Sequence, residues 1–266
     1  MLRPRIIPCL LVKGQGLVKT IKFKDPTYVG DPINAVRIFN EKEVDELIVL
    51  DIEASLKKHE PNYKLIEGFA AECRMPLCYG GGVKTLDQIQ RIIGLGVEKV
   101  ALGAAAIENH ALVEQAAGIV GSQSIVVVLD IKKHGSRYEV FINSGRKKVD
   151  GTMLEHVRTL VALGVGEIVI NSIDNDGTMK GYDYEMVQMV QNEISIPLTV
   201  LGGAGKLDDI QQLFRGFGLI GAAAGSLFTF RGQYRAVLIN YPSRQEKEGL
   251  LPNNSTMTSL LREGIS

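Results

Sequence analysis

Two glycine pairs at equivalent places in the chain are the residues whose type and spacing most directly suggest chemistry. Gly81-Gly82 follows the apolar segment Pro76-Leu77-Cys78-Tyr79, and Gly202-Gly203 follows Pro197-Leu198-Thr199-Val200-Leu201, with an offset of 121 residues between the two segments. A glycine pair where a strand meets a helix lets backbone N–H groups and the helix dipole approach a phosphate closely. Two such places predict a ligand with a phosphate at each end, although tight turns at strand ends would use the same glycines.

Four charged residues form a second candidate constellation, because each stands at the beginning of an expected strand. They are Arg5, Glu46, Lys99 and Glu167, and the two glutamates again lie 121 residues apart. If the alternation of side chains points all four into a barrel, two cations and two anions close one of its ends. The same alternation gives an apolar interior lining of Ile7, Cys9, Ile48 and Val169. A solvated rim of exposed pairs is the alternative, but buried ion pairs add little reliable stability, so a purely structural barrel would gain little from the ring.

The elements that must position these residues alternate between strands and helices along the chain. Short segments rich in Ile, Val and Leu, as expected of strands buried on both faces, occur at 5–11, 46–51, 76–80, 99–103, 124–130, 167–171, 197–201 and 219–223. Helical patterns intervene, with Asp31, Asn62, Thr85 and Asp183 as N-caps. Eight strand–helix units in two fours predict a (β/α)8 TIM barrel of two duplicated half-barrels, with residues 1–250 as a single domain. A doubly wound open sheet is the alternative, but it would not predict the repeat.

Three segments interrupt this alternation. Residues 12–30 read as a long loop, either a lid over an anionic ligand or a solvated charged loop, with Lys13, Lys19, Lys22 and Lys24. Residues 138–149 read as a small hairpin that turns at Asn143-Ser144-Gly145. Residues 251–266 are rich in Asn, Ser and Thr, and we expect a flexible tail there.

The composition narrows the class of protein. Among 266 residues, 30 basic and 30 acidic side chains cancel, so the sequence gives no indication of binding to nucleic acid or to a membrane. Cys9, Cys73 and Cys78 form no C-x-x-C pair, and no signal peptide or membrane-spanning segment is recognisable, so we expect a soluble cytoplasmic protein. The histidines lack metal-ligand spacing, and we expect neither a metal nor a cofactor.

Several segments together carry a specific resemblance. They are Arg5-Ile6-Ile7 with Cys9, Gly30-Asp31-Pro32, Asp45-Glu46-Leu47, Leu50-Asp51-Ile52, Gly80-Gly81-Gly82, Gly121-Ser122-Gln123, Ser172-Ile173-Asp174, Asp176-Gly177-Thr178 and Gly202-Gly203-Ala204-Gly205-Lys206. Over residues 1–240 the chain resembles the HisF family, the cyclase subunit of imidazole glycerol phosphate synthase in histidine biosynthesis. The resemblance implies that a substrate with two phosphates binds at the top of the barrel. It also implies that a HisH-like glutaminase docks at the bottom and sends ammonia through the barrel axis.

The resemblance assigns roles to particular residues. Arg5, Glu46, Lys99 and Glu167 would form the gate of the ammonia path. The ligand- and phosphate-binding set would be Lys19, Gly81, Gly82, Asp176, Gly177, Gly202, Gly203, Gly225 and Ser226. The family's two acid–base aspartates correspond to Asp130 and to Leu11, whose alkyl side chain cannot transfer a proton. Loss of such a group typically removes about 10² to 10⁴ in rate.

A second departure concerns the phosphate site of the first half-barrel. Gly103-Ala104 stand where the family usually has Asn-Thr, which leaves backbone donors only. We therefore expect the stronger anion site in the second half-barrel, around Gly203 and Ser226.

The opening of the chain is similar to a narrower group. Residues 7–13, 16–20, 28–35 and 37–43 look like the HisF-like proteins of surface-polysaccharide gene clusters, which work with a HisH-like glutaminase and an N-acetyl sugar amidotransferase. This resemblance implies a glutamine amidotransferase subunit for acetamidino-sugar formation in lipopolysaccharide biosynthesis. One alternative is a cyclase (a lyase) of histidine biosynthesis that has relocated its acid. The other is a non-catalytic scaffold that binds a phosphate ligand and activates a glutaminase.

Overall fold

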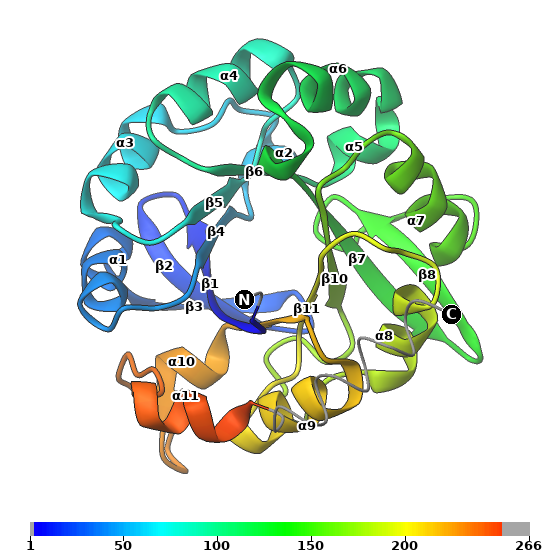
Figure 1. Ribbon diagram of the computed structural model, residues 1–266. Helices are drawn as coiled ribbons and strands as arrows, with labels where there is room; N and C mark the ends of the chain where they lie inside the picture. Colours follow the sequence, from blue (N-terminus) through cyan, green and yellow to red (C-terminus); the bar gives the residue numbers. More distant parts are fainter. Residues whose placement is uncertain (1–2, 252–266) are drawn as a thin grey trace.

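The computed structural model describes residues 3–251, and within them eight parallel strands close into a barrel (Figure 1). In spatial order these strands are β10 (Glu167–Ser172), β11 (Leu198–Leu201), β12 (Gly221–Ala224), β1 (Arg5–Lys13), β4 (Leu47–Asp51), β5 (Leu77–Gly80), β6 (Lys99–Leu102) and β7 (Ile125–His134). The pairing of β7 with β10, in which Asp130 lies opposite Asn171, closes the ring. The predicted TIM barrel is therefore confirmed.

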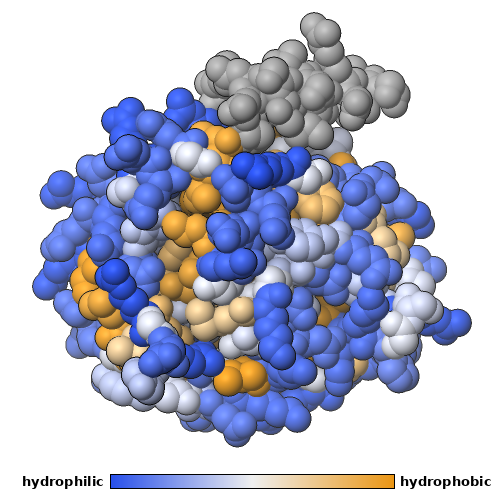
Figure 2. Space-filling model, turned by 90° about the horizontal axis from the view of Figure 1, so that it is seen from below, coloured by the Kyte–Doolittle hydropathy of each residue, from blue (hydrophilic) through white to orange (hydrophobic). Residues whose placement is uncertain are grey.

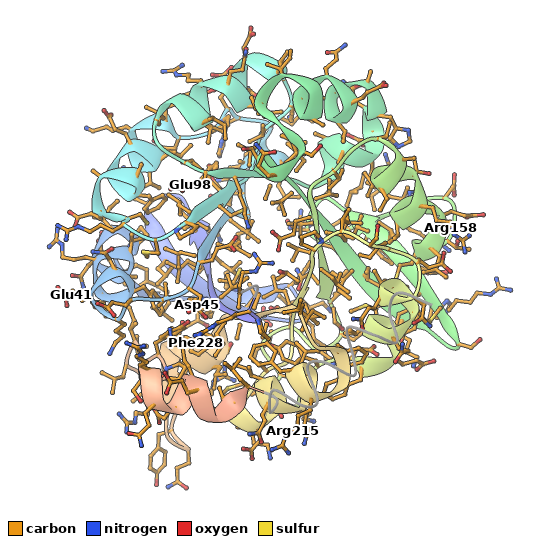
Figure 3. The ribbon with its side chains drawn as sticks, in the orientation of Figure 1. Glu41, Asp45, Glu98, Arg158, Arg215 and Phe228 are labelled. Atoms are coloured by element: carbon orange, nitrogen blue, oxygen red, sulfur yellow. The ribbon has the colours of Figure 1, made fainter. Side chains whose placement is uncertain are left out.

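A layer of helices covers the outside of the barrel (Figure 1). The longer ones are α1 (Pro32–Glu41), α3 (Tyr63–Glu72), α4 (Leu86–Gly94), α6 (His110–Val120), α7 (Met153–Ala162), α8 (Tyr184–Gln191), α9 (Leu207–Phe217) and α11 (Arg244–Leu250). The side chains of Asp31, Asn62, Thr85 and Asp183 accept hydrogen bonds from backbone N–H groups in the first turns, so the predicted N-caps are confirmed. Charged side chains lie on the outer faces of the helices, as Figure 3 shows for Glu41, Arg158 and Arg215.

Buried apolar residues form two clusters on opposite sides of the strands. The larger one fills the space between strands and helices, and Ile6 and Leu10 of β1 belong to it. The smaller one lies inside the barrel and consists of Ile7, Cys9, Ile48, Cys78, Ala101, Val126, Val169, Leu201 and Ala223. It contains all four residues predicted to line the interior. Because side chains alternate along each strand, residues of β1 contribute to both clusters.

Residues 12–30 differ from the predicted loop. β1 continues to Lys13 and pairs with β2 (Gly16–Ile21), and β2 pairs in turn with β3 (Lys24–Gly30), both antiparallel. Lys19 and Thr20 of β2 are buried, each only 5% exposed. The prediction of a loop was wrong because this segment is rich in lysine and glycine and does not show the apolar–polar alternation typical of a strand. Its strands form because they pack against the barrel.

The second hairpin region is larger than predicted. The turn at Asn143-Ser144-Gly145 is confirmed, since it joins β8 (Arg137–Ile142) to β9 (Lys147–Lys148). However, β7 also extends to His134 and pairs antiparallel with β8. Three short helices that the sequence did not predict, α2 (Ala54–Lys57), α5 (Ala104–Glu108) and η1 (Ser122–Ser124), lie between barrel strands and long helices.

The last part of the described chain returns to the amino-terminal end of the barrel. After β12 come α10 (Ser226–Thr229), β13 (Phe230–Arg231), β14 (Ala236–Val237) and then α11. The hydroxyl of Tyr241 donates to the carbonyl of Ile6 at 2.9 Å, and Lys247 pairs with Asp45 at 2.8 Å. Figure 2 views the molecule from below Figure 1, the flank on which α9, α10 and α11 lie, and apolar residues gather mainly on the left half of that face. Of the predicted tail, residues 252–266 lie outside the described residues.

Candidate active site

A cavity of about 590 Å³ opens at the carboxyl-terminal ends of the barrel strands. All nine residues predicted to bind the ligand line it, namely Lys19, Gly81, Gly82, Asp176, Gly177, Gly202, Gly203, Gly225 and Ser226. Asp130 and Leu11 line it as well. The barrel therefore brings together residues that lie up to 215 positions apart, from Leu11 to Ser226, in one pocket. That these residues bind a phosphorylated ligand stays a prediction.

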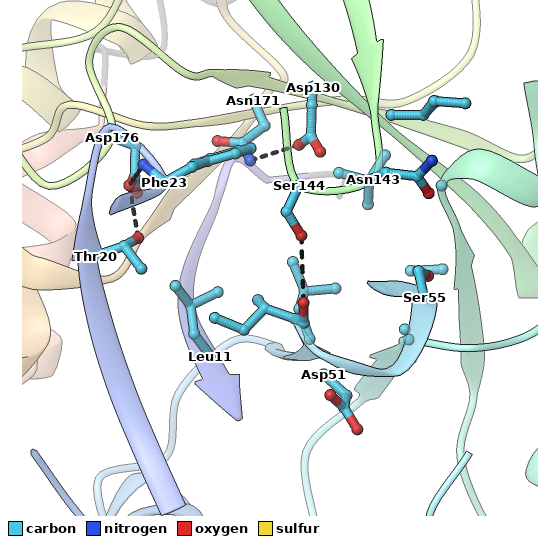
Figure 4. A pocket seen from close by; sticks show the side chains of 18 of the residues that line it. Leu11, Thr20, Phe23, Asp51, Ser55, Asp130, Asn143, Ser144, Asn171 and Asp176 are labelled. Carbon is cyan, nitrogen blue, oxygen red and sulfur yellow. Dashed lines mark hydrogen bonds between the residues drawn. The ribbon is translucent and has the colours of Figure 1, made fainter. Parts of the chain in front are cut away.

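Asp130 is the pocket carboxylate best suited to proton transfer. It lies on β7, and Asn171 Nδ2 donates to its Oδ1 at 2.9 Å (Figure 4). Burial raises the pKa of Asp130 to about 7, although the hydrogen bond from Asn171 lowers it. By contrast, Asp51 Oδ1 accepts the backbone N–H groups of Glu53 and Ala54 and serves as a local cap. A carboxyl group that titrates near neutral pH can act as a general base at that pH.

Two other pocket residues bear on proton transfer, Leu11 on β1, which faces β7 from across the barrel, and Asn171 on β10, which pairs with β7. Leu11 is half-buried and packs against the interior apolar cluster, so β1 offers no proton-transferring group at this place. Asn171 is 6% exposed, and its Oδ1 is buried without a hydrogen-bond partner among the described residues. Asn171 is not among the predicted site residues, although a polar residue at the end of an apolar strand is a usable signal.

The second half-barrel supplies one end of the pocket. Gly203 has a φ of +111°, and a Cβ there would lie 2.1 Å from the carbonyl oxygen of Gly181, so only glycine fits. Lys19 is 5% exposed, donates to the carbonyl of Cys9 at 2.7 Å and lies beside Gly225. Burial lowers the pKa of Lys19, and the nearby Asp176 partly offsets this effect. A buried cation beside glycine N–H groups suits an anionic group of a ligand.

The first half-barrel supplies the other end of the pocket. Gly82 has a φ of +73°, and a Cβ there would lie 2.9 Å from the carbonyl oxygen of His59. The cations Lys58, Lys84 and Arg146 also line the pocket, and that the stronger anion site lies in the second half-barrel stays a prediction. Lys84 follows Gly82 by two residues and could have been found from sequence. Arg146 could not have been found in this way, because it lies in the β8–β9 turn, which follows the fifth barrel strand, and only the folded hairpin places it at the pocket.

The β2–β3 hairpin is fastened over the pocket by Asp176. Oδ2 of Asp176 accepts from the hydroxyl of Thr20 at 2.7 Å and from the N–H of Phe23 at 3.0 Å (Figure 4). Its backbone carbonyl accepts from the N–H of Lys22 at 2.9 Å. Burial raises the pKa of Asp176, and these two side-chain contacts lower it. The β2–β3 hairpin therefore covers the end of the pocket that the second half-barrel forms.

The four predicted ring residues meet at the opposite, amino-terminal end of the barrel. Lys99 Nζ contacts Glu46 at 2.7 Å and Glu167 at 2.8 Å, while Arg5 contacts Glu167 at 2.7 Å and also pairs with Glu46. Thr199, which the sequence analysis did not include, donates to Glu167 at 2.6 Å. Glu46 and Glu167 are only 3% and 4% exposed, so the alternative of a solvated rim is wrong.

The charges in this ring stabilise one another. Burial alone would raise the pKa of Glu167, but the two cations outweigh it and lower the pKa to about 2. Burial likewise works against the charged form of Lys99, and the two glutamates raise its pKa nonetheless. Glu167 and Lys99 are therefore ionised at neutral pH, and the ring closes the mouth below the apolar interior.

The structure describes residues 3–251, and two further kinds of site are absent from this range. No group of three or more His, Cys, Asp or Glu side chains in this range could hold a metal ion. None of the helices described is long and apolar enough to cross a membrane.

Comparisons with known proteins agree with this geometry. The family described as "Histidine biosynthesis protein" matches residues 5–235. The chain is 57% identical over 254 residues to a protein of Leptospira borgpetersenii with the provisional name imidazole glycerol phosphate synthase subunit HisF, covering 95% of this chain and 100% of that protein. It is 57% identical to a provisionally named subunit hisF3 of Vibrio vulnificus, covering 94% and 97%. It is 37% identical to the imidazole glycerol phosphate synthase subunit HisF of Natranaerobius thermophilus, covering 93% and 99%.

Proposed function

This chain belongs to the histidine biosynthesis protein family as a HisF-type barrel, and we propose that it is the synthase subunit of a glutamine-dependent amidotransferase. A HisH-like glutaminase would dock at the amino-terminal end of the barrel and supply ammonia. The observation that carries the proposal is the ring of Arg5, Glu46, Lys99 and Glu167, which lies on the barrel axis below an apolar interior that leads to Asp130.

The barrel interior suits the passage of ammonia. An apolar lining disfavours the ammonium ion, so nitrogen would travel as the neutral, nucleophilic molecule. A ring of paired charges can open when one side chain rotates while the other pairs stay in contact. Lys99, with 19% of its side chain exposed, is better placed to rotate than the buried glutamates. The ring would thus act as a gate rather than as a seal.

The pocket at the other end favours a reaction that needs one proton-transferring group. When ammonia adds to an electrophilic carbon, the new nitrogen carries a positive charge until it loses a proton, and Asp130 can accept that proton. A cyclisation that uses an acid and a base would need a second group, and Leu11 does not provide one. We therefore propose that the acceptor is an activated sugar derivative, which an N-acetyl sugar amidotransferase converts to an acetamidino sugar in lipopolysaccharide biosynthesis.

The second candidate function is that of the cyclase subunit of imidazole glycerol phosphate synthase in histidine biosynthesis. The names of the three relatives favour this candidate, since each refers to that synthase. In that case, a group other than Leu11 must supply the second proton transfer.

One assay separates the two candidates. The purified chain is given the histidine-pathway substrate and an ammonium salt, and formation of imidazole glycerol phosphate is compared with that by the HisF subunit of Natranaerobius thermophilus. We expect a rate lower by about 10² or more, because one acid–base group is missing. A rate within tenfold of the reference would favour the cyclase. Co-purification with a glutaminase and an amidotransferase would support the first candidate.

A further inference from the structure

We propose that an apolar collar closes the end of the barrel interior that meets the pocket, and that it lets neutral ammonia pass in preference to water and ammonium. The collar consists of Leu11, Leu50, Val128 and Leu201. The inference rests on the proposed function, because it concerns the path by which ammonia would reach the pocket. It adds a second barrier to the charged ring at the amino-terminal mouth, and it gives Leu11 a role in place of proton transfer.

The collar marks the boundary between the pocket and the interior. Its side chains line the pocket, and they also belong to the interior apolar cluster or pack against it. Cys9 and Ala101 lie on the same boundary but are only 2% and 3% exposed. The deeper members of the cluster do not line the pocket and are at most 2% exposed, namely Ile7, Ile48, Cys78, Val126, Val169 and Ala223. The pocket therefore ends at the collar, and the interior below it is shielded from solvent.

The strand order places the collar residues around the barrel axis. Leu11 of β1 and Leu50 of β4 are direct partners in the register of these neighbouring strands. A Cβ at Gly80 of the next strand, β5, would lie 3.0 Å from Leu50 Cδ2, so Leu50 fills space that β5 leaves free. Val128 lies on β7, across the barrel from β1, and Leu201 lies on β11, which β12 separates from β1. The collar therefore surrounds the axis rather than covering one wall.

An apolar constriction discriminates between ammonia and the species that accompany it. Water and ammonium would lose hydrogen bonds in the collar, since none of its side chains carries a polar atom to replace them. Ammonia is neutral and a weaker hydrogen-bond donor than water, so it loses less on entry. Asp130 follows Val128 on the same inward face of β7 and lines the pocket with Leu11 (Figure 4). Ammonia that leaves the collar would therefore arrive at the proposed general base.

The collar can open without movement of the strands. Leu11, Leu50 and Val128 are half-buried, whereas Leu201 is 7% exposed. The half-buried side chains have space on the pocket side, because they line the cavity. A change between staggered rotamers of one leucine is enough to widen the constriction for a molecule as small as ammonia. The barrier is thus a property of side chains, and single substitutions should change it.

The cysteines of the chain allow a test on the barrel alone. Cys78 lies below the collar, and Cys73, at the end of α3, lies outside the barrel. The variant Ser55→Cys adds a thiol that reports access to the pocket itself. Each thiol is labelled with methyl methanethiosulfonate, a small neutral reagent, and followed by peptide mass spectrometry at mildly alkaline pH. We expect the pocket thiol to react at least about 10²-fold faster than Cys78, and equal rates would overturn the proposal.

Substitutions on the two faces of β1 separate the collar from general stability. Leu11→Asn keeps the size of the side chain but lets water enter, so Cys78 should react at least about tenfold faster. Leu11→Met keeps the collar apolar and should leave the rate within about twofold. Val12→Ala is the control, because Val12 packs in the outer cluster on the opposite face of β1. It should accelerate Cys78 by less than about threefold, at a stability that urea denaturation records for every variant.

The comparison of Leu11→Asn with Val12→Ala decides the matter. If both accelerate the labelling of Cys78 alike, or if neither does, the collar is ordinary packing and the proposal is overturned. The labelling uses neither a glutaminase nor a substrate, so its outcome is independent of the proposed function. That function fails separately if the chain neither binds a glutaminase nor uses ammonia.

Discussion

Asn171 Nδ2 donates a hydrogen bond to Asp130 Oδ1 at 2.9 Å, across the β7–β10 pairing that closes the barrel. The two residues are direct partners in the strand register, so the backbone holds their side chains next to each other. This contact favours the ionised form of Asp130, whose pKa burial raises to about 7. Asn171 is therefore a positioning residue for the group that we propose as general base.

Asn171→Leu should raise the pKa of Asp130 further, because it removes the hydrogen bond that lowers it. We expect a shift of about one unit, since a hydrogen bond to a charged group contributes about 1.5 kcal/mol and one pKa unit corresponds to about 1.4 kcal/mol. The measurement is a ¹³C NMR titration of the Asp130 carboxyl group. Asn143→Leu changes another amide that lines the pocket and should leave the titration in place. An unchanged pKa in Asn171→Leu would show that the contact is absent in solution.

Asp130→Asn should stabilise the protein at alkaline pH. The folded-state pKa of about 7 lies above the ordinary aspartate value of 3.8, so the fold disfavours the ionised form. Below the unfolded-state pKa both states are protonated and the group has no effect; the cost grows as pH rises and is complete above about 7. We expect the Tm of Asp130→Asn to exceed that of the unsubstituted chain at pH 8.5 and to match it near pH 4. An equal difference at both pH values would contradict the raised pKa.

The sequence was sufficient for the barrel because its signals are local and repeated. The caps at Asp31 and Thr85 depend only on neighbouring residues, and the 121-residue offset is found by comparing one half of the sequence with the other. The ring of four charges was also predictable, since each member begins a strand. The ring also includes Thr199, which was missed. The predicted members each begin an expected strand, whereas Thr199 is the second residue of β11, a strand that the sequence placed at 197–201.

The parts that the sequence could not predict depend on contacts between distant segments. Arg146 reaches the pocket only because Ser144 and Lys147 anchor its hairpin to residues 92 and 39 positions away. The β2–β3 hairpin was mistaken for a loop because Lys19 and Thr20 become buried only against the barrel. Such long-range packing overrides local propensity, and no periodic pattern in the sequence predicts it.

Gly203→Ala should destabilise the fold as well as the anion site. The new Cβ would meet the carbonyl oxygen of Gly181 at 2.1 Å, at a φ of +111° that alanine rarely adopts. We expect a loss of at least about 2 kcal/mol in the free energy of unfolding, measured by urea denaturation. The control is Gly216→Ala in α9, where nothing lies within 4 Å. That change should stabilise by about 0.5–1 kcal/mol, and a loss there would contradict the assignment of ordinary helical geometry.

Thr20→Val should loosen the hairpin that covers the pocket. It removes the hydrogen bond to Asp176 at 2.7 Å while keeping the shape of the side chain. Hydrogen exchange of the amides in residues 16–30 should therefore become faster, by about three- to tenfold for a lost contact of roughly 1 kcal/mol. Thr27→Val is the matched control, because Thr27 is exposed and contacts only the carbonyl of Asp25 at 3.4 Å. If both variants exchange alike, Asp176 does not fasten the hairpin.

Lys99→Ala addresses both the stability and the proposed role of the ring. The glutamates keep Arg5, and Glu167 also keeps Thr199, so the chain should still fold. We expect a loss of about 2 kcal/mol, below the value for a fully buried pair because Lys99 is partly exposed. Glu167 has a folded pKa of about 2, so the ring's contribution is present above the unfolded value near 4.5 and disappears as pH falls towards 2. The difference in stability between the variant and the unsubstituted chain should therefore shrink below pH 4.5.

The same variant tests the ammonia path in the complex with its glutaminase. Product formation driven by glutamine should change far more than product formation driven by an ammonium salt, because only the former requires passage through the ring. Arg158→Ala removes a cation of an exposed pair with Glu193 on the outer helices and should alter neither rate. If Lys99→Ala changed the two rates in equal proportion, or left both unaltered, the ring would be a structural cluster. The route from the amino-terminal mouth to Asp130 would then lose the observation on which it rests.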